Sequence, residues 1–384
     1  MVASPAVVLL ALCLLTVSSC AAEEQPAPAA APHSIAALLQ PFVDRHVLAG
    51  AVTLVATKDK VLSLEAVGFA DIAANKPMRT DALFWVASQS KPVTATALMM
   101  LVDEGKVNVE DPVEKYLPEF KDQMLAVGKE EKRKPAHPIK VREVLSHTSG
   151  LPFASPIEHP TLDLHPLCDA VRSYAAVPLQ FEPGTKHQYA NAGLNTAGRI
   201  IEVVSGMPYE EFLQKRLFDP LGMKDSTFVP SEEQVQRLAK SYKPNADKTG
   251  LIETPIGQLK YPLTDRQRYP MPAGGLFSTA ADMGRFCQMI LNGGEFEGKR
   301  YVSEASVKMM TSKQTGDALK EGYGFGWGVG GGGFGHGGAY STDMSIDPKR
   351  GLVLVWLVQH AGYPGDGGKS HNVFKSAAEQ QFGK

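Results

Sequence analysis

The sequence predicts an α+β fold, in which one β-sheet is built from both ends of the chain and a mainly helical region is inserted between its halves. Alternating apolar and polar residues over 50–70 predict paired strands, and β-like runs return at 325–329, 339–346 and 352–358. From about residue 105 to 235 the pattern is mainly helical and is broken by loops rich in proline and glycine. At 384 residues, the chain is long enough for a substantial core and for two or three domains.

The N-terminus is predicted to be a targeting segment. Residues 7–17 are apolar but too few to span a bilayer as a mature helix, and small residues follow them up to Ala22. Cleavage after Ala22 makes residues 1–22 a signal peptide and releases a periplasmic or extracellular protein. Alternatively, the sequence around Cys20 resembles a bacterial lipobox, and lipid on Cys20 tethers the protein to a membrane. In either case, residues 23–34 are predicted to be a flexible linker.

The composition excludes some classes of function. A formal net charge of −2 argues against a nucleic-acid-binding protein, which usually carries a basic excess. No spacing of His, Cys and acidic residues is typical of a metal site, so neither a metal nor another cofactor is expected. Of the four cysteines, Cys168 and Cys287 lie well beyond the leader, and the sequence leaves open whether they form a disulfide.

The first predicted elements are the two strands within 50–70, joined by a turn at residues 58–60. An apolar segment then leads to Ser88, where a helix is expected to begin. Pro92 fits only in the first turn of that helix, because its missing N–H would be unpaired there anyway. Gly105 is a typical C-terminal stop. Further helices are predicted at 141–145, 194–204, 209–217 and 372–382.

Ser88 and Lys91 are the first candidate catalytic residues. They are three positions apart at the start of the predicted helix, so their side chains share one face. A serine hydroxyl is a poor nucleophile until a base takes its proton, and a lysine whose charge is suppressed can be that base. The helix start also favours negative charge developing near the Ser88 N–H. Taken alone, the pair is more typical of a capping serine beside a surface lysine.

Tyr189 and Asn191 form the second candidate pair, in the one Tyr-x-Asn of the chain. A tyrosine hydroxyl can carry a proton between nucleophile and leaving group. The Asn191 amide can donate to a substrate carbonyl. The simpler alternative is a packed tyrosine beside a helix-capping asparagine.

His336, Gly338 and Ala339 form the third candidate group. They follow a glycine run and are predicted to open the strand at 339–346, where glycine lets the backbone and the substrate approach closely. The Ala339 N–H can then face the Ser88 N–H across a carbonyl and form an oxyanion hole. A competing Lys-Thr-Gly at 248–250 lies in a turn-forming cluster, so we interpret it as a surface hairpin turn.

The three motifs together, in this order, resemble the serine β-lactamase/penicillin-binding superfamily and in particular its class C branch. The motifs are Ser88-x-x-Lys91, Tyr189-x-Asn191 and His336-x-Gly338. The resemblance covers nearly the whole mature chain and extends to segments 144–151, 181–185 and 273–279.

This resemblance implies a β-lactamase/transpeptidase-like fold, in which an antiparallel sheet is flanked by helices. We place the α/β domain at residues 35–90 and 270–384 and the mainly helical domain at 91–269. The resemblance also implies an acyl-enzyme mechanism. Ser88 attacks a carbonyl, Lys91 and Tyr189 move protons, and the N–H groups of Ser88 and Ala339 hold the oxyanion. Which of Lys91 and Tyr189 acts as the base stays open.

The departure from the family pattern bears on the substrate. Class C β-lactamases have Lys-Thr-Gly where this chain has His336 to Gly338, and a histidine is mostly neutral at pH 7. The resemblance therefore favours a serine hydrolase acting on esters, similar to family VIII carboxylesterases. A D-alanyl-D-alanine carboxypeptidase or D-aminopeptidase-type amidase is the alternative, and a class C β-lactamase is less favoured. The expected partner is a small-molecule ester or peptide, whereas the natural acyl group and the oligomeric state are not predicted.

Overall fold

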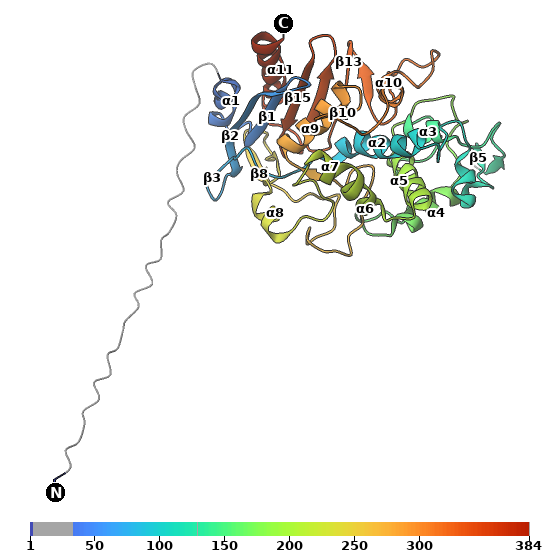
Figure 1. Cartoon of the computed structure of the whole chain (residues 1–384), viewed down its shortest axis with the longest axis horizontal. Helices are drawn as coiled ribbons and strands as arrows, with labels where there is room; N and C mark the ends of the chain where they lie inside the picture. The colour runs from blue at the N-terminus through green and yellow to red at the C-terminus, as the bar shows by residue number, and fades with distance from the viewer. Residues whose placement is uncertain (3–33, 129, 384) are drawn as a thin grey trace.

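A computed structural model describes residues 1–2, 34–128 and 130–383 (Figure 1). The predicted leader and linker, Cys20 included, lie outside the described residues except for Met1, Val2 and Ser34. Among the helices that the structure describes, none is long and apolar enough to cross a membrane.

A seven-stranded antiparallel sheet occupies one half of the molecule, in the order β12-β13-β14-β15-β1-β2-β3. Strands from both ends of the chain meet in it, because Val52 to Ala56 of β1 pair with Leu357 to Val353 of β15. This arrangement confirms the predicted antiparallel sheet built from both ends. The strands are β1 (Gly50–Ala56), β2 (Val61–Asp71), β3 (Lys76–Pro77), β12 (Gly328–Gly330), β13 (Gly333–Gly337), β14 (Asp343–Asp347) and β15 (Leu352–Leu357).

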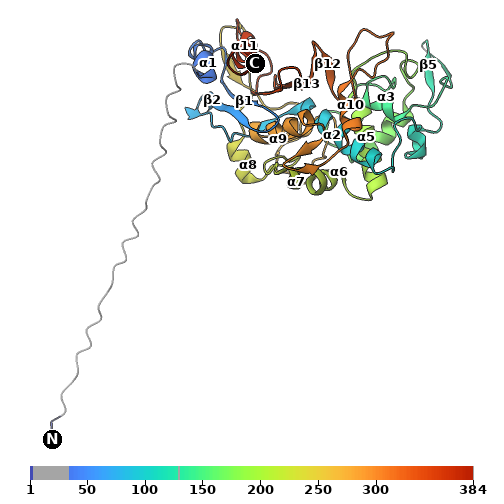
Figure 2. The same cartoon turned by 45° about the horizontal axis from the view of Figure 1, so that its top comes forward.

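The central strands β1 and β15 are buried on both faces, so their successive side chains enter two different cores. On β15, Leu354 and Trp356 pack with α1 (Ile35–Asp44) and α11 (Lys369–Phe382). Val353 and Val355 enter the larger core, which also holds α9 (Ala280–Leu291). Figure 2 shows the resulting layers, with α1 and α11 on one face of the sheet and α9 on the other.

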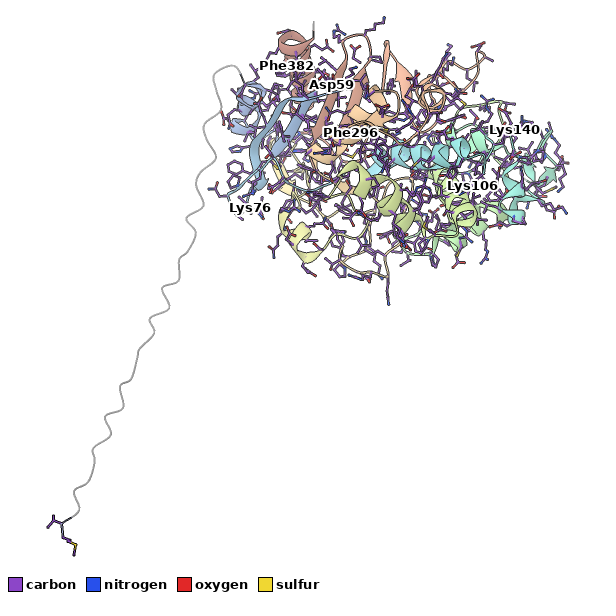
Figure 3. All side chains as sticks on the ribbon, viewed as in Figure 1. Asp59, Lys76, Lys106, Lys140, Phe296 and Phe382 are labelled. Carbon is purple, nitrogen blue, oxygen red and sulfur yellow. The ribbon has the colours of Figure 1, made fainter. Side chains whose placement is uncertain are left out.

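The predicted turn between the first two strands is present, because the Thr57 N–H donates to the Lys60 carbonyl at 2.9 Å. Figure 3 labels Asp59 in this turn and Phe382 at the end of α11. The closing helix begins at Lys369, slightly earlier than predicted.

The glycine-rich strands differ from the prediction. The predicted strand at 325–329 overlaps β12 only at Gly328 and Val329, and the predicted strand at 339–346 begins only at Asp343. Residues 338–342 instead form a turn, in which the Gly338 N–H donates to Thr342 O at 2.7 Å and Ser341 adopts a φ of 65°. His336 therefore lies near the end of β13 and does not open β14. Alternating pattern alone does not reveal this turn, because Ala339 and Tyr340 are apolar.

Most of the helical half lies beside the sheet, with α3, α4 and α5 at the right of Figure 1, whereas α8 lies at the lower left. The helices predicted at 141–145, 194–204 and 209–217 are all present. The boundaries of the two domains at residues 91 and 269 stay a prediction. The helices of this half are α3 (Val141–Leu145), α4 (Leu167–Ala176), α5 (Asn191–Ser205), α6 (Tyr209–Leu213) with a π-helical extension (Gln214–Phe218), α7 (Asp219–Leu221) and α8 (Glu232–Arg237).

Four short antiparallel strand pairs, helix α10 and three 3₁₀ turns complete the described fold. One pair carries the segment before Ser88 and is treated below. The elements are β4 (Phe84–Trp85) with β9 (Phe277–Ser278), β5 (Leu125–Val127) with β6 (Glu131–Arg133), β7 (Tyr242–Pro244) with β8 (Leu251–Glu253), β10 (Glu295–Phe296) with β11 (Lys299–Arg300), α10 (Glu304–Thr311), and 3₁₀ turns at Ala87–Gln89, Val113–Lys115 and Pro118–Phe120.

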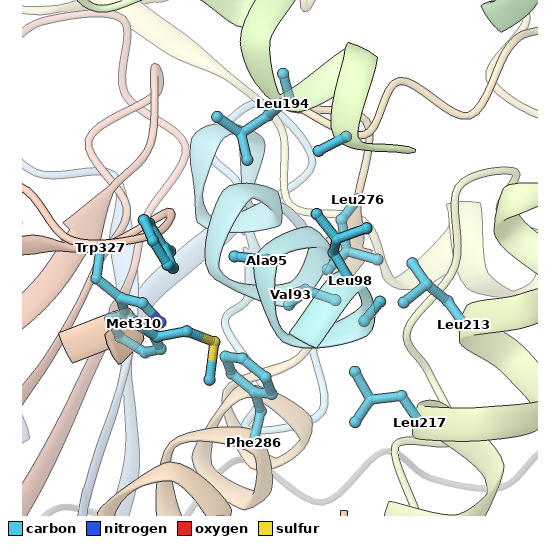
Figure 4. Packing of buried hydrophobic residues seen from close by; sticks show 14 of the residues in the cluster. Val93, Ala95, Leu98, Leu194, Leu213, Leu217, Leu276, Phe286, Met310 and Trp327 are labelled. Atoms are coloured by element: carbon cyan, nitrogen blue, oxygen red, sulfur yellow. The ribbon is translucent and has the colours of Figure 1, made fainter. Parts of the chain in front are cut away.

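Helix α2 (Ser90–Asp103) joins the two halves of the molecule. Every residue from Ser90 to Leu101 is buried, as expected for a helix that is apolar on all sides. Figure 4 shows Leu98 of this helix among leucines of the helical half, with Phe286 and Trp327 on the other side. Truncating such a fully buried leucine to alanine typically costs about 2–5 kcal/mol. This packing fixes the position of the first turn of α2, which follows Ser88.

Cys168 and Cys287 are free thiols. Cys168 is partly exposed on α4, whereas Cys287 is buried on α9 with its sulfur 3.6 Å from that of Met344. The two cysteines therefore do not form the disulfide that the sequence left open.

Candidate active site

Ser88 lies in a 3₁₀ turn immediately before α2. Strand β4 pairs with β9 just before this turn, and the buried Trp85 Nε1–H donates to Gly274 O at 2.7 Å. The chain then turns sharply, because Ala87 adopts a φ of 48°, a region that costs a residue with a side chain some strain. The Ser90 hydroxyl donates to Ala87 O at 2.6 Å and supports this bend. The result is a partly exposed Ser88 side chain on a rigid, buried base.

The Lys91 ammonium nitrogen is fully buried and lies 3.0 Å from Ser88 Oγ. It donates to the side-chain oxygen of Asn191 at 2.9 Å and to Ala273 O at 2.6 Å. Burial lowers the pKa of Lys91 well below its usual value of 10.5. A neutral amine has two N–H bonds and one lone pair. Because both oxygens can only accept, they engage the two N–H bonds and leave the lone pair for the Ser88 hydroxyl.

Helix α5 positions both acceptors of the Lys91 hydrogen bonds, Asn191 Oδ1 directly and Ala273 O through Asn195. Asn191 is its first residue, and Asn195, one turn later, accepts from the Ala273 N–H at 3.0 Å. The Asn195 amide then donates to Tyr174 Oη at 2.9 Å, and that hydroxyl donates to Glu158 at 2.6 Å. Tyr174 and Asn195 are buried, so these hydrogen bonds form a dry chain that holds residue 273 against Lys91.

Tyr189 lies directly before α5, and the Lys91 Nζ lies 4.6 Å from the centre of its ring. Burial raises the pKa of Tyr189 to about 12, and a hydrogen bond with the Ser88 hydroxyl offsets part of that effect. The phenol therefore keeps its proton at neutral pH. Ser88, Lys91, Tyr189 and Asn191, predicted as site residues from separate motifs, are thus brought together in one place.

Gly338 brings the third motif against Ser88. A Cβ at this position would lie 2.1 Å from Thr342 Oγ1 and 2.6 Å from Val86 O, so only glycine fits. The contact sets the turn after β13 beside the segment that carries Ser88. Ala339 follows at the edge of the same cleft. Ser88, Gly338 and Ala339 therefore line one cleft, while the predicted oxyanion hole of the Ser88 and Ala339 N–H groups stays a prediction.

Both ring nitrogens of His336 have hydrogen-bond partners within the protein, whereas direct binding of a substrate would need one of them free. Its Nδ1 lies 2.7 Å from Gly337 O, and its Nε2 lies 2.9 Å from Tyr323 Oη. Burial, followed by the nearby Lys91, lowers the pKa of His336 to about 4. The neutral ring therefore donates through Nδ1 and accepts from the tyrosine, so both nitrogens are already used.

Ser88 opens onto a cleft of about 380 Å³. Apolar and aromatic groups form most of its walls, and two side-chain amides supply polarity. No lysine or arginine occurs among the described residues that line it. Its lining includes Trp85, Phe153, Met271, Tyr189, Asn191, Gln258 and His336.

Two other features are separate from this cleft. A hollow of about 580 Å³ beside α8 contains none of the motif residues. Lys248 to Gly250, as predicted, form the exposed turn of the β7–β8 hairpin, with Lys248 at a φ of 60°. Across the described residues, no group of three or more His, Cys, Asp or Glu side chains is placed to bind a metal.

Several residues of the site were not predicted from the sequence. Phe153, Gln258, Tyr323 and Asn195 come from loops or helices with no motif of their own. Asn195 had one usable signal, because it is four residues after Asn191 and so shares its helix face. His147 lies in segment 144–151, which resembles the family, but no role was predicted for it.

Comparison with known proteins identifies the family. The family model for Beta-lactamase matches residues 35–378. This chain belongs to the Beta-lactamase family. Protein Rv1367c of Mycobacterium tuberculosis is 32% identical over 361 residues, which cover 84% of this chain and 89% of that protein.

Two further proteins are similar to this chain. Esterase EstB of Burkholderia gladioli is 31% identical over 289 residues, or 67% of this chain and 70% of EstB. The solved structure of EstCE1, described as a hydrolase with promiscuous acyltransferase activity, has a TM-score of 0.76 and 25% identity. That match covers 90% of this chain and 97% of EstCE1. The predicted β-lactamase-like fold is confirmed, and the chain is a serine hydrolase of this family.

Proposed function

We propose that this protein is a carboxylesterase that cleaves uncharged esters through an acyl-enzyme on Ser88. The observation that carries the proposal is the neutral cleft around Ser88, whose described lining has neither lysine nor arginine. A substrate carboxylate entering such a cleft would lose water without gaining a cation. The similarity to EstB, an esterase, supports the same activity.

The first half of the reaction forms the acyl-enzyme. The neutral Lys91 amine takes the proton of Ser88 Oγ, and that oxygen bonds to the ester carbonyl carbon. The carbonyl oxygen becomes negative and is held by the N–H groups of Ser88 and Ala339. As the ester C–O bond breaks, Tyr189 gives its proton to the departing oxygen and regains one from the Lys91 ammonium. The alcohol leaves with one proton, and no net charge is created.

The second half releases the acid. Water attacks the acyl carbon and loses a proton to Lys91, and the same two N–H groups hold the oxyanion. Ser88 Oγ leaves and recovers its proton, which completes the cycle. Assigning Lys91 as base and Tyr189 as acid follows from opposite effects of burial, since the ammonium pKa is lowered and the phenol pKa is raised to about 12.

The alternative is a peptidase or amidase acting on D-amino-acid substrates. A D-alanyl-D-alanine carboxypeptidase must hold a terminal carboxylate, and penicillins also carry one. His336 does not supply the missing charge, because its pKa is lowered to about 4 and both its nitrogens are engaged. The cleft therefore favours uncharged esters over D-alanyl-D-alanine peptides and penicillins.

A matched pair of esters tests the proposal. p-Nitrophenyl butyrate and the p-nitrophenyl monoester of succinate have the same leaving group and similar acyl length, but the second carries a carboxylate. We expect wild type to prefer butyrate by at least tenfold in kcat/KM, and Ser88→Ala to hydrolyse neither. A chromogenic cephalosporin and a D-alanyl-D-alanine peptide complete the assay. Equal rates on the two esters, or faster turnover of the peptide or cephalosporin, would overturn the proposal.

We also propose that the enzyme is exported. The support is the apolar, small-residue leader in the sequence, with Cys20 in a lipobox-like context. Expression of the full chain with Cys20→Ala beside wild type separates the two modes of export. Membrane association lost in the variant would indicate a lipid anchor, and equal release of both would indicate signal-peptide cleavage. Retention of both in the cytoplasm would contradict export.

A further inference from the structure

His147 is the buried histidine closest in structure to the proposed general acid, and no step of the mechanism uses it. It follows α3, and 1% of its surface is exposed. Its ring centre lies 4.5 Å from that of Tyr189 and 4.7 Å from that of Tyr323. We propose that His147 is a positioning residue that fixes the Tyr189 phenol for proton transfer to the leaving group, an inference that rests on the proposed esterase activity.

Hydrogen bonds tie His147 to both neighbours of Tyr189. The Gln188 N–H donates to the His147 carbonyl at 2.9 Å, and the Ala190 N–H donates to His147 Nδ1 at 3.2 Å. The backbone N–H groups of the two residues that flank Tyr189 are therefore both bonded to His147. Together with the ring contact, these bonds limit movement of the Tyr189 backbone and of one face of its ring.

Two costs accompany this arrangement. His147 adopts a φ of 59°, which is uncommon for a residue with a side chain. Its Nε2 is buried without a hydrogen-bond partner among the described residues. An apolar side chain would avoid the unpartnered nitrogen. The residue is therefore better explained by its Nδ1 acceptor and its ring than by simple filling of the core.

His147 is a neutral acceptor in this setting. Burial, and then the nearby Lys91, His336 and His187, lower its pKa well below its usual value. With Nδ1 accepting from Ala190, the ring proton is on Nε2. His147 therefore holds Tyr189 by geometry and does not exchange protons with it.

Leaving-group dependence separates this role from simple structural support. A p-nitrophenolate ion leaves without a proton, whereas an alkoxide needs one from Tyr189. In His147→Gly, which keeps the positive φ without strain, the misplaced phenol should lower kcat/KM for ethyl butyrate by about 10²-fold. The same variant should lower kcat/KM for p-nitrophenyl butyrate by less than about fivefold, because the rest of the site is intact.

A second variant tests the acceptor itself. Asparagine tolerates a positive φ and places an oxygen where His147 Nδ1 accepts from Ala190. His147→Asn should therefore recover much of the ethyl butyrate activity that His147→Gly loses. The matched control is His46→Gly, since His46 is an exposed histidine with a φ of 57° outside the cleft. It should hydrolyse both esters as wild type does.

The outcomes distinguish the two proposals. Equal losses on the two esters in His147→Gly, or no recovery in His147→Asn, would overturn the positioning role while leaving the esterase activity in place. If wild type hydrolyses neither ester, the esterase proposal fails and this one fails with it. A preserved wild-type ratio of the two rates in a folded His147→Gly would also overturn the positioning role.

Discussion

Replacing Gly338 with alanine tests whether the turn after β13 must approach Ser88 as closely as the structure shows. The new Cβ would lie 2.1 Å from Thr342 Oγ1 and 2.6 Å from Val86 O. The threonine side chain can rotate away, but Val86 O belongs to the backbone just before Ser88. Residues 338–339 must therefore move by roughly 0.5–1 Å to restore an ordinary contact distance.

The size of the effect follows from that movement. The Ala339 N–H would move away from the oxyanion position, and a displacement of about 1 Å in a catalytic group costs roughly 10²-fold in rate. Loss of one oxyanion donor has an effect of about 10²–10³ in kcat. We expect Gly338→Ala to lower kcat for p-nitrophenyl butyrate by about 10²-fold with little change in KM. Strain in the packed turn should cost a further 1–3 kcal/mol, roughly, in the free energy of unfolding.

The neighbouring glycine supplies the control. A Cβ on Gly337 would lie 3.5 Å from Thr342 O and 3.8 Å from Asp343 Oδ1, which is ordinary contact. Gly337→Ala should therefore change kcat by less than about threefold and stability by less than about 1 kcal/mol. Steady-state kinetics and urea unfolding of both variants give the comparison. If Gly338→Ala keeps wild-type kcat, or if both variants lose activity equally, the close approach of Gly338 is not what aligns the oxyanion hole.

Three further predictions concern protonation, stability and the excluded motif. Lys91 must be neutral to accept a proton, so kcat/KM should rise with pH as Lys91 loses its proton around its lowered pKa. Ionisation of Tyr189, whose pKa is raised to about 12, should not lower kcat/KM at pH values below about 12. A rise only near pH 10.5 in a pH–rate profile would contradict the buried-base assignment. Tyr174→Phe removes the hydrogen bonds that the tyrosine hydroxyl makes with Glu158 Oε1 and with the Asn195 amide, and should reduce the free energy of unfolding by about 1–3 kcal/mol in urea titration. No change would show that these hydrogen bonds do not stabilise the fold. Lys248 lies in an exposed hairpin turn, so Lys248→Ala should keep kcat/KM within about twofold of wild type. A tenfold loss would place the Lys-Thr-Gly motif at 248–250 in the active site.

The sequence predicted those features that depend on local geometry. Ser88 and Lys91 are one helical turn apart, so their proximity follows from the helix that Pro92 and Gly105 delimit. The sheet built from both ends of the chain was also predictable, because strand patterns occur at residues 50–70 and again in the last third of the sequence. Tyr189 and His336 are far from Ser88 in sequence, and only the family resemblance connected them with it.

Features that depend on tertiary contacts could not be predicted from patterns. The pattern predicts a strand at 339–346, whereas residues 338–342 form a turn that depends on the Gly338–Thr342 hydrogen bond and on the close approach to Val86. Asn195 and His147 act through partners that are distant in the sequence. His336 matches its motif, but its hydrogen bond to Tyr323 became visible only once β13 was positioned.

Detection of the acyl-enzyme on Ser88 tests the central claim most directly. Wild type and Ser88→Ala would be mixed with excess p-nitrophenyl butyrate, quenched in acid during turnover and analysed by peptide mass spectrometry. We expect a butyryl group on the peptide containing Ser88 in wild type, located on Ser88 by fragmentation, and none in the variant. Turnover by Ser88→Ala, or a butyryl group located on another residue during turnover, would contradict the central claim.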